Sequence, residues 1–133
     1  MSTKARIAGL ALSATALALV PATAHAAPAT SQIGAYVTFT VSGDRDGLRD
    51  ARYVSCYPHS GNHPHYAQVC DLLAETHGDL AQSGYDAGPC PMIWDPVTVT
   101  AYGHWENSRV HYRGHYSNAC VADRATGGVM FDF

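Results

Sequence analysis

The sequence predicts an α+β fold, a single domain built on an antiparallel sheet with one main helix and two disulfides. Several short stretches alternate apolar and polar residues with a period of two, which is typical of half-buried strands. One stretch instead repeats its apolar residues at spacings of three and four, which is typical of an amphipathic helix. All four cysteines lie after residue 55, within the part of the chain that carries these patterns.

Residues 1–26 are predicted to be a secretory signal peptide. Two basic residues precede an apolar run over residues 7–20, and small residues at its end favour cleavage after Ala26. A transmembrane anchor is the alternative, but the run is shorter than the roughly 20 apolar residues that a span requires. We therefore expect a mature domain of residues 27–133, secreted and extracellular, with no membrane association in its mature form.

The charge balance of the predicted mature chain argues against a nucleic-acid partner. Loss of the first 26 residues leaves six arginines, no lysine and all eleven acidic residues, so the formal charge changes from −3 to −5. Binding to phosphates depends on clustered Lys and Arg, and the six arginines form no run.

The four cysteines predict two disulfides, because an exported chain meets an oxidising environment. Their spacing leaves all three pairings open. A zinc site is the competing use, but no two cysteines have the separation of two to four residues that is typical of zinc ligands.

The first strand is predicted at residues 35–41, where the alternation puts Val37, Phe39 and Val41 on one face. Glycine and polar residues predict a turn at 42–47, and a second turn, containing Trp105, at 103–107. The remaining strands are predicted at residues 51–57, 97–102, 109–116 and, as a short apolar terminal strand, 129–133.

The main helix is predicted to follow Pro64, which suits a first helical turn because its missing N–H would be unpaired there. Gly78 is expected to stop or break it. Loops are predicted on either side, at residues 58–64 and 82–89. The apolar face of the helix is formed by Tyr66, Val69, Cys70, Leu73, His77 and Leu80.

The segment Cys90-Pro91-Met92-Ile93 has the chemistry of a bait for a serine protease. Such a protease binds an extended strand by main-chain pairing and fills its pockets with alternate side chains. Pro91 and a disulfide at Cys90 would stiffen the loop, and the disulfide would hold a newly formed Ile93 amino group close by, so that the bond reseals. Met92 is long and apolar, which suits the broad pocket of subtilisins. Taken alone, the segment also fits a disulfide-flanked turn with a buried methionine.

The wider sequence resembles the subtilisin inhibitors secreted by Streptomyces, over nearly the whole predicted mature chain. The most specific matches are the segments 90–97, 103–105 and 116–120. The resemblance implies helices packed on one face of the sheet, a short second helix among them, and a non-covalent homodimer. It also implies an extracellular subtilisin-like protease as partner, with no catalytic residues and no cofactor.

The resemblance further assigns roles to individual residues. It implies that Met92-Ile93 is the reactive bond, that Asn118 supports the loop through its side-chain amide, and that the disulfides pair Cys56 with Cys70 and Cys90 with Cys120. The loop expected to contact the protease consists of Pro89, Cys90, Pro91, Met92, Ile93, Trp94 and Asp95. Pro89 is a departure, because it stands where a flexible apolar side chain would fill a protease subsite better.

The seven histidines of the predicted mature chain support a second hypothesis, a secreted histidine-rich module that binds a metal or another ligand. His59, His63 and His65 are close in sequence, but no helical spacing fixes them as ligands, and we expect exposed loop histidines and no metal. An EF-hand calcium pattern and a Gly-x-Ser-x-Gly nucleophile motif are both missing, which argues against a calcium site and a hydrolase.

Overall fold

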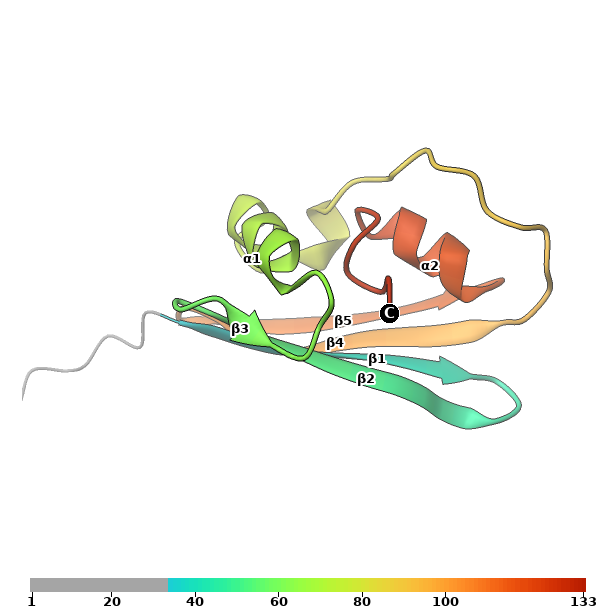
Figure 1. The fold of residues 1–133 in the computed structure, drawn as a ribbon, viewed down its shortest axis with the longest axis horizontal. Coiled ribbons are helices and arrows are strands. Elements are labelled where there is room, and N and C mark those ends of the chain that lie inside the picture. The colour runs from blue at the N-terminus through green and yellow to red at the C-terminus, as the bar shows by residue number, and fades with distance from the viewer. Residues whose placement is uncertain (1–33) are drawn as a thin grey trace, which may run out of the picture. The chain divides into compact units, whose positions relative to one another are not determined.

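A computed structural model describes residues 34–133, so the predicted signal peptide lies outside the described residues, as does the predicted start of the mature chain. The described residues form one five-stranded antiparallel sheet in the order β3-β2-β1-β4-β5. Helices α1 and α2 and the short 3-10 helix η1 all lie on one face of this sheet (Figure 1). The elements are β1 Ala35–Gly43, β2 Gly47–Cys56, β3 Ser60–Gly61, α1 Tyr66–Glu75, η1 Leu80–Gln82, β4 Val97–Trp105, β5 Ser108–Tyr116 and α2 Ala119–Ala125. The predicted fold class is confirmed.

The period-two alternation of the sequence places the core on the helical face of the sheet. In the central strand β1, Val37, Phe39 and Val41 point into the core and their neighbours are more exposed. In β4, Val97 and Val99 are fully buried in the same way. Burying this apolar face beneath the helices is the main source of stability of the domain.

The predicted turn at residues 103–107 is placed too early, because β4 continues through Gly103 and His104 to Trp105 and the turn occupies residues 106–107. Gly103 permits a close approach of neighbouring strands: a Cβ atom there would lie 1.9 Å from the Tyr36 carbonyl oxygen. Glycine was therefore a packing requirement of the strand and not a turn signal. The turn comes only at Glu106, whose φ is 49°.

Helix α1 begins near the predicted position but ends at Glu75, earlier than the apolar pattern through His77 and Leu80 suggests. His77 and Gly78 have positive φ values of 51° and 80°, and the Gly78 N–H donates to the Leu73 carbonyl oxygen at 2.8 Å, which is typical of a helix end. Leu80 is buried all the same, because η1 returns it to the core.

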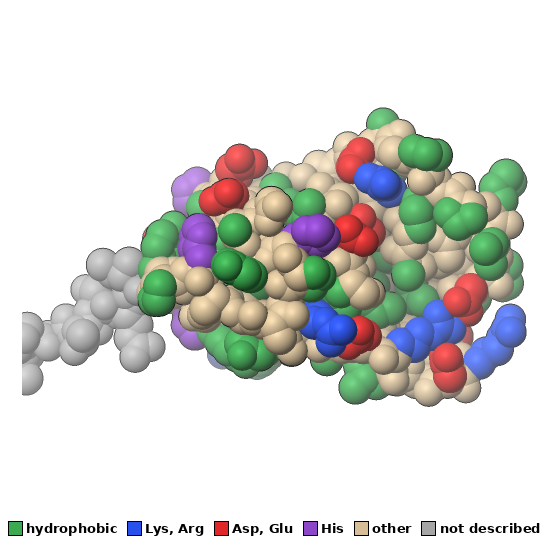
Figure 2. All heavy atoms as spheres, in the orientation of Figure 1, with side chains coloured by type: hydrophobic (Ala, Val, Ile, Leu, Met, Phe, Trp, Pro, Cys, Tyr) green, Lys and Arg blue, Asp and Glu red, His purple; other side chains and the backbone are tan. Residues whose placement is uncertain are grey.

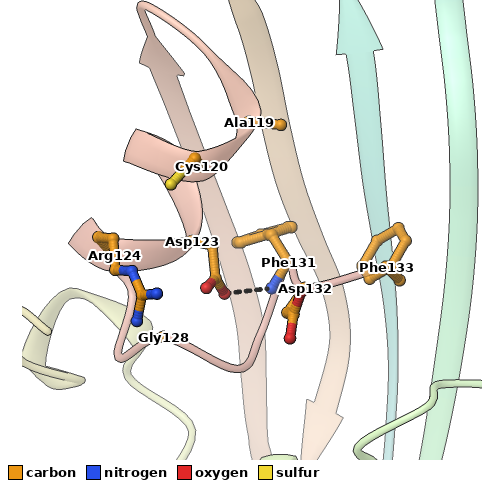
Figure 3. A pocket seen from close by; sticks show the side chains of 8 residues that line it. All are labelled: Ala119, Cys120, Asp123, Arg124, Gly128, Phe131, Asp132 and Phe133. Carbon is orange, nitrogen blue, oxygen red and sulfur yellow. Dashed lines mark hydrogen bonds between the residues drawn. The ribbon is translucent and has the colours of Figure 1, made fainter. Parts of the chain in front are cut away.

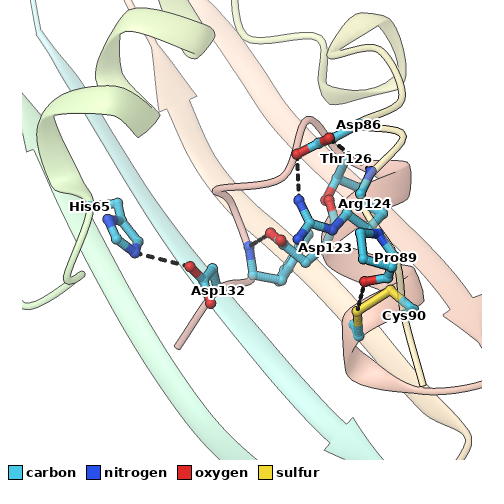
Figure 4. Close-up of polar contacts among 11 residues, drawn as sticks. His65, Asp86, Pro89, Cys90, Asp123, Arg124, Thr126 and Asp132 are labelled. Carbon is cyan, nitrogen blue, oxygen red and sulfur yellow. Dashed lines mark hydrogen bonds and ion pairs between the residues drawn. A yellow bond between two sulfur atoms is a disulfide. The ribbon is translucent and has the colours of Figure 1, made fainter. Parts of the chain in front are cut away.

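The predicted terminal strand at residues 129–133 is also wrong, because this segment forms turns and an irregular end. Met130 and Phe131 are both buried although they are adjacent, which strand alternation does not allow. The Phe131 N–H donates to the Asp123 carboxylate at 3.3 Å (Figure 3). Asp132 accepts from His65 Nε2 at 3.0 Å (Figure 4). The segment is thus held by side chains of α2 and of the loop before α1, not by a strand ladder.

Candidate functional site

The chain between η1 and β4 is a long loop that arches away from the sheet (Figure 1). Three consecutive large apolar side chains lie at its far end: Met92 is fully exposed, and Ile93 and Trp94 are 59% and 72% exposed. Figure 2 shows hydrophobic side chains projecting at this end of the molecule. A buried Met92 in a closed turn is therefore excluded. Contiguous exposed apolar residues of this kind mark an interaction site.

Asn118 connects this loop to the body of the domain. It lies at the start of α2, is only 7% exposed, and its Oδ1 accepts from the Val121 N–H at 3.0 Å, as an N-cap residue does. Its Nδ2 donates to the carbonyl oxygens of Pro91, at 3.2 Å, and of Ile93, at 2.9 Å. One side chain thus caps a helix and holds the two carbonyls on either side of Met92.

The disulfides join Cys56 to Cys70 and Cys90 to Cys120, which is the pairing that the resemblance implies. The second bridge ties the loop to α2 two residues before Met92. This position corrects one step of the sequence argument, because the bridge restrains the Met92 side of the Met92-Ile93 bond. The Ile93 side depends on other contacts.

The Ile93 side of the loop is fixed where it enters the sheet. The Asp95 N–H donates to the Ser117 carbonyl oxygen at 2.9 Å, and Pro96 is buried. The Asp95 carboxylate accepts two hydrogen bonds from Arg49, Nη1 to Oδ2 at 2.7 Å and Nη2 to Oδ1 at 2.8 Å. This two-point arrangement restrains orientation as well as distance.

The same ion pair sets the electrostatics of this end of the loop. The hydrogen bonds from Arg49 hold the pKa of Asp95 below its ordinary value, so the carboxylate is charged at neutral pH. In return, hydrogen bonding to Asp95 and to Asp46 raises the pKa of the Arg49 guanidinium. Asp46 accepts from Arg49 Nε at 3.1 Å, so the guanidinium is shared by two carboxylates.

The structure brings together most of the residues that the sequence singled out for this site. Residues 90–94 line one open pocket together with Asn118, and Cys120 is bonded to Cys90. Pro89 is exposed just before this segment. Sequence reasoning missed Arg49, to which no local pattern gives a role. It lies 46 positions before Asp95, and no local pattern connects the two.

In the part of the chain that the structure describes, the histidines do not gather into a metal site. His63 was expected to be exposed but is only 2% exposed; its Nε2 donates to the Met130 carbonyl oxygen at 3.1 Å, while its Nδ1 accepts from the His65 N–H at 3.0 Å. His65 and His115 pair with acidic side chains. Within residues 34–133, no group of three His, Cys, Asp or Glu side chains could hold a metal ion.

Comparison with known proteins gives a consistent result. A family model described as "Subtilisin inhibitor-like" matches residues 29–118. The "Subtilase-type protease inhibitor" of Streptomyces fradiae is 31% identical, covering 98% of this chain and 96% of that protein. The "Subtilisin inhibitor" of Streptomyces albogriseolus is 39% identical, covering 60% of this chain and 56% of that protein.

A solved structure matches as well. It is the crystal structure of Streptomyces caespitosus sermetstatin in complex with Bacillus licheniformis subtilisin. The sermetstatin chain is 33% identical, with a TM-score of 0.61, and the match covers 74% of this chain and 97% of that chain.

Proposed function

This chain belongs to the subtilisin inhibitor-like family, and on that premise we propose that it inhibits subtilisin-type serine proteases by offering Met92-Ile93 as a bait peptide bond. The observation that carries the proposal is the full exposure of Met92 between two carbonyls that Asn118 holds. Like the relatives named above, the chain acts as an inhibitor and not as an enzyme.

The proposed binding mode is that of a substrate. The loop pairs with the protease main chain, Met92 enters the primary specificity pocket, and the neighbouring side chains from Pro89 to Asp95 occupy the flanking subsites. The Met92 side chain is flexible and apolar, so it fits a broad hydrophobic pocket of the protease but not a pocket that contains a buried carboxylate. Because the loop is ordered before binding, little conformational entropy is lost on association.

The experiment that tests this proposal is a titration. The purified chain is added to subtilisin with a chromogenic peptide substrate, with trypsin and a metalloprotease measured alongside. We expect subtilisin activity to fall linearly to an end point at equal molar amounts, with or without a chelator. Full subtilisin activity in a molar excess of the chain would contradict the proposal.

We also propose that residues 1–26 are a secretory signal and that the mature inhibitor, residues 27–133, is extracellular. The basic start, the apolar run and the small residues before Ala27 support this. Within residues 34–133, no helix is long and apolar enough to cross a membrane. Expression of the full chain in a secreting host should release a protein that begins at Ala27; a product that keeps Met1 would contradict the assignment.

The helix-free face of the sheet supports a homodimer as the proposed assembly. Tyr36 and Tyr53 stack there with ring centroids 5.6 Å apart, and Tyr102, also on this face, is 58% exposed. A second copy of the chain would remove these aromatic rings from water. Sedimentation should give twice the chain mass, and Tyr102→Glu should reduce it to the monomer. A monomeric wild type at micromolar concentration would contradict the proposal.

A further inference from the structure

The two ends of the bait loop are held by different kinds of contact. On the Met92 side, the disulfide from Cys90 to Cys120 is covalent and survives cleavage of the bait bond. On the Ile93 side, Asn118 donates to the Ile93 carbonyl oxygen, the Asp95 N–H donates to the Ser117 carbonyl oxygen, and Arg49 forms an ion pair with Asp95. The position of a newly formed Ile93 amino group therefore depends on these non-covalent contacts and on the short peptide segment that leads into β4.

Arg49 is well placed to supply such a contact because of the fold. It lies on β2 just after the β1–β2 turn, and this turn lies beside the end of the loop, since the Asp44 N–H donates to the Pro96 carbonyl oxygen at 3.2 Å. Figure 2 shows acidic and basic side chains gathered over this end of β1 and β2. The guanidinium makes both of its paired bonds to Asp95 while Nε holds Asp46.

The sequence also leaves room for the guanidinium. A Cβ atom at Gly43 would lie 2.0 Å from Asp46 Oδ1, 2.4 Å from Arg49 Nε and 2.5 Å from Arg49 Nη2. Such distances are far below van der Waals contact, so an alanine at position 43 would push aside both the guanidinium and the Asp46 carboxylate that it binds. The absence of a side chain at Gly43 thus permits the observed geometry of Arg49.

We propose that Arg49 is a positioning residue of the inhibitory reaction, which holds residues 93–95 in place through Asp95 after the bait bond is cut. The inference rests on the proposed function. It explains why the Ile93 side stays close to the acyl-enzyme although the disulfide lies on the other side of the bond.

The chemical step is reversible. The protease serine Oγ attacks the Met92 carbonyl carbon, the bond from this carbon to the Ile93 nitrogen breaks, and the serine proton passes through the protease histidine to the departing amine. In the reverse step the Ile93 amine attacks the ester carbon, the amide bond forms again, and the proton returns to the serine oxygen. If Arg49 keeps the amine at the ester, the reverse step competes with entry of water.

The test is the ratio of cleaved to intact inhibitor at equilibrium with a catalytic amount of subtilisin. This ratio depends on the inhibitor alone, and a general loss of fold stability does not change it while the protein stays folded. For Arg49→Met we expect the ratio to rise about fivefold, and the wild-type ratio to rise in 1 M salt, because an exposed ion pair is screened. Arg49→Lys keeps the charge but not the two-point geometry, so its ratio of cleaved to intact inhibitor should lie between those of the wild type and Arg49→Met.

Two further variants sharpen the test. Gly43→Ala keeps every charge and should raise the ratio in the same direction. Arg109→Met is the matched control, because it removes one exposed arginine at the opposite end of the sheet, beside the β4–β5 turn, and should leave the ratio at the wild-type value. The double variant with Asp95→Asn and Arg49→Met should raise the ratio no further than either single change does, because both changes remove the same ion pair.

The outcomes separate the two proposals. A folded Arg49→Met protein with the wild-type ratio would overturn the role of Arg49 while leaving inhibition intact. A wild-type chain that neither inhibits subtilisin nor is cleaved at Met92-Ile93 would overturn the proposed function and the role of Arg49 with it. An equal rise in Arg109→Met would show a general charge effect and would likewise overturn the role of Arg49.

Discussion

Replacement of Asn118 separates two tasks that one side chain performs in this structure. The Oδ1 atom caps α2 by accepting from Val121, and Nδ2 donates to the carbonyls of Pro91 and Ile93. Asn118→Ala removes both tasks. Asn118→Asp keeps an oxygen that can cap the helix but loses both hydrogen bonds to the loop.

The expected magnitudes follow from these contacts. A hydrogen bond makes a net contribution of about 1 kcal/mol, so loss of the two bonds to the loop is expected to destabilise the ordered loop by about 2 kcal/mol. If this loss is expressed fully in binding, the inhibition constant rises roughly thirtyfold in both variants. Loss of the cap costs about 1 kcal/mol in the alanine variant alone. For a domain of this size that corresponds to a fall in Tm of roughly 4–8 °C.

The assay combines two measurements on the same samples. Inhibition constants are determined against subtilisin with a chromogenic substrate, and Tm is determined by circular dichroism. We expect Asn118→Asp to inhibit poorly while its Tm stays above that of Asn118→Ala. An Asn118→Asp protein with the wild-type inhibition constant would refute the reasoning, because Asn118 would then act only as a helix cap.

Three other changes test separate parts of the account. Met92→Lys should direct inhibition toward trypsin, because the pocket residue changes while the scaffold is kept; unchanged selectivity in paired titrations would mean that the reactive bond is misassigned. Joint replacement of Cys90 and Cys120 by serine should turn the inhibitor into a substrate, seen as inhibition that decays over time, and lasting inhibition would contradict this. Burial lowers the pKa of His63 in the folded protein, so as the pH falls the unfolded chain is the first to protonate this imidazole. The free energy of unfolding should therefore fall as pH drops through about 6.5 toward the folded pKa. Urea titrations at several pH values measure this, and His63→Gln should weaken the dependence of the free energy of unfolding on pH. The same dependence in the wild type and in His63→Gln would contradict the prediction.

The sequence was most informative where one face of a strand is buried. Alternation located β1, β4 and β5 because Val37, Phe39, Val99 and Val110 must all reach the same core. It failed at Met130 and Phe131, because an apolar pair can be buried in a tight turn as well as in a strand. Burial here depends on α2 and on Asp123, which only the folded chain brings near.

The candidate site was predictable only in part, for a similar reason. Local chemistry indicated a stiff loop around Pro91 and Met92, but the role of Asn118 came from the family resemblance. The pairing of Arg49 with Asp95 arises because the β1–β2 turn folds beside the end of the loop. Contacts between segments so distant in sequence follow from sheet topology, which no local pattern contains.

The central claim is that Met92-Ile93 is the bond presented to the protease. The most direct measurement is mass spectrometry and amino-terminal sequencing after long incubation with a catalytic amount of subtilisin. The account predicts a single new amino terminus at Ile93, with intact protein remaining at equilibrium and forming again from the purified cleaved product. Cleavage at another bond, or complete degradation without an inhibitory phase, would contradict it.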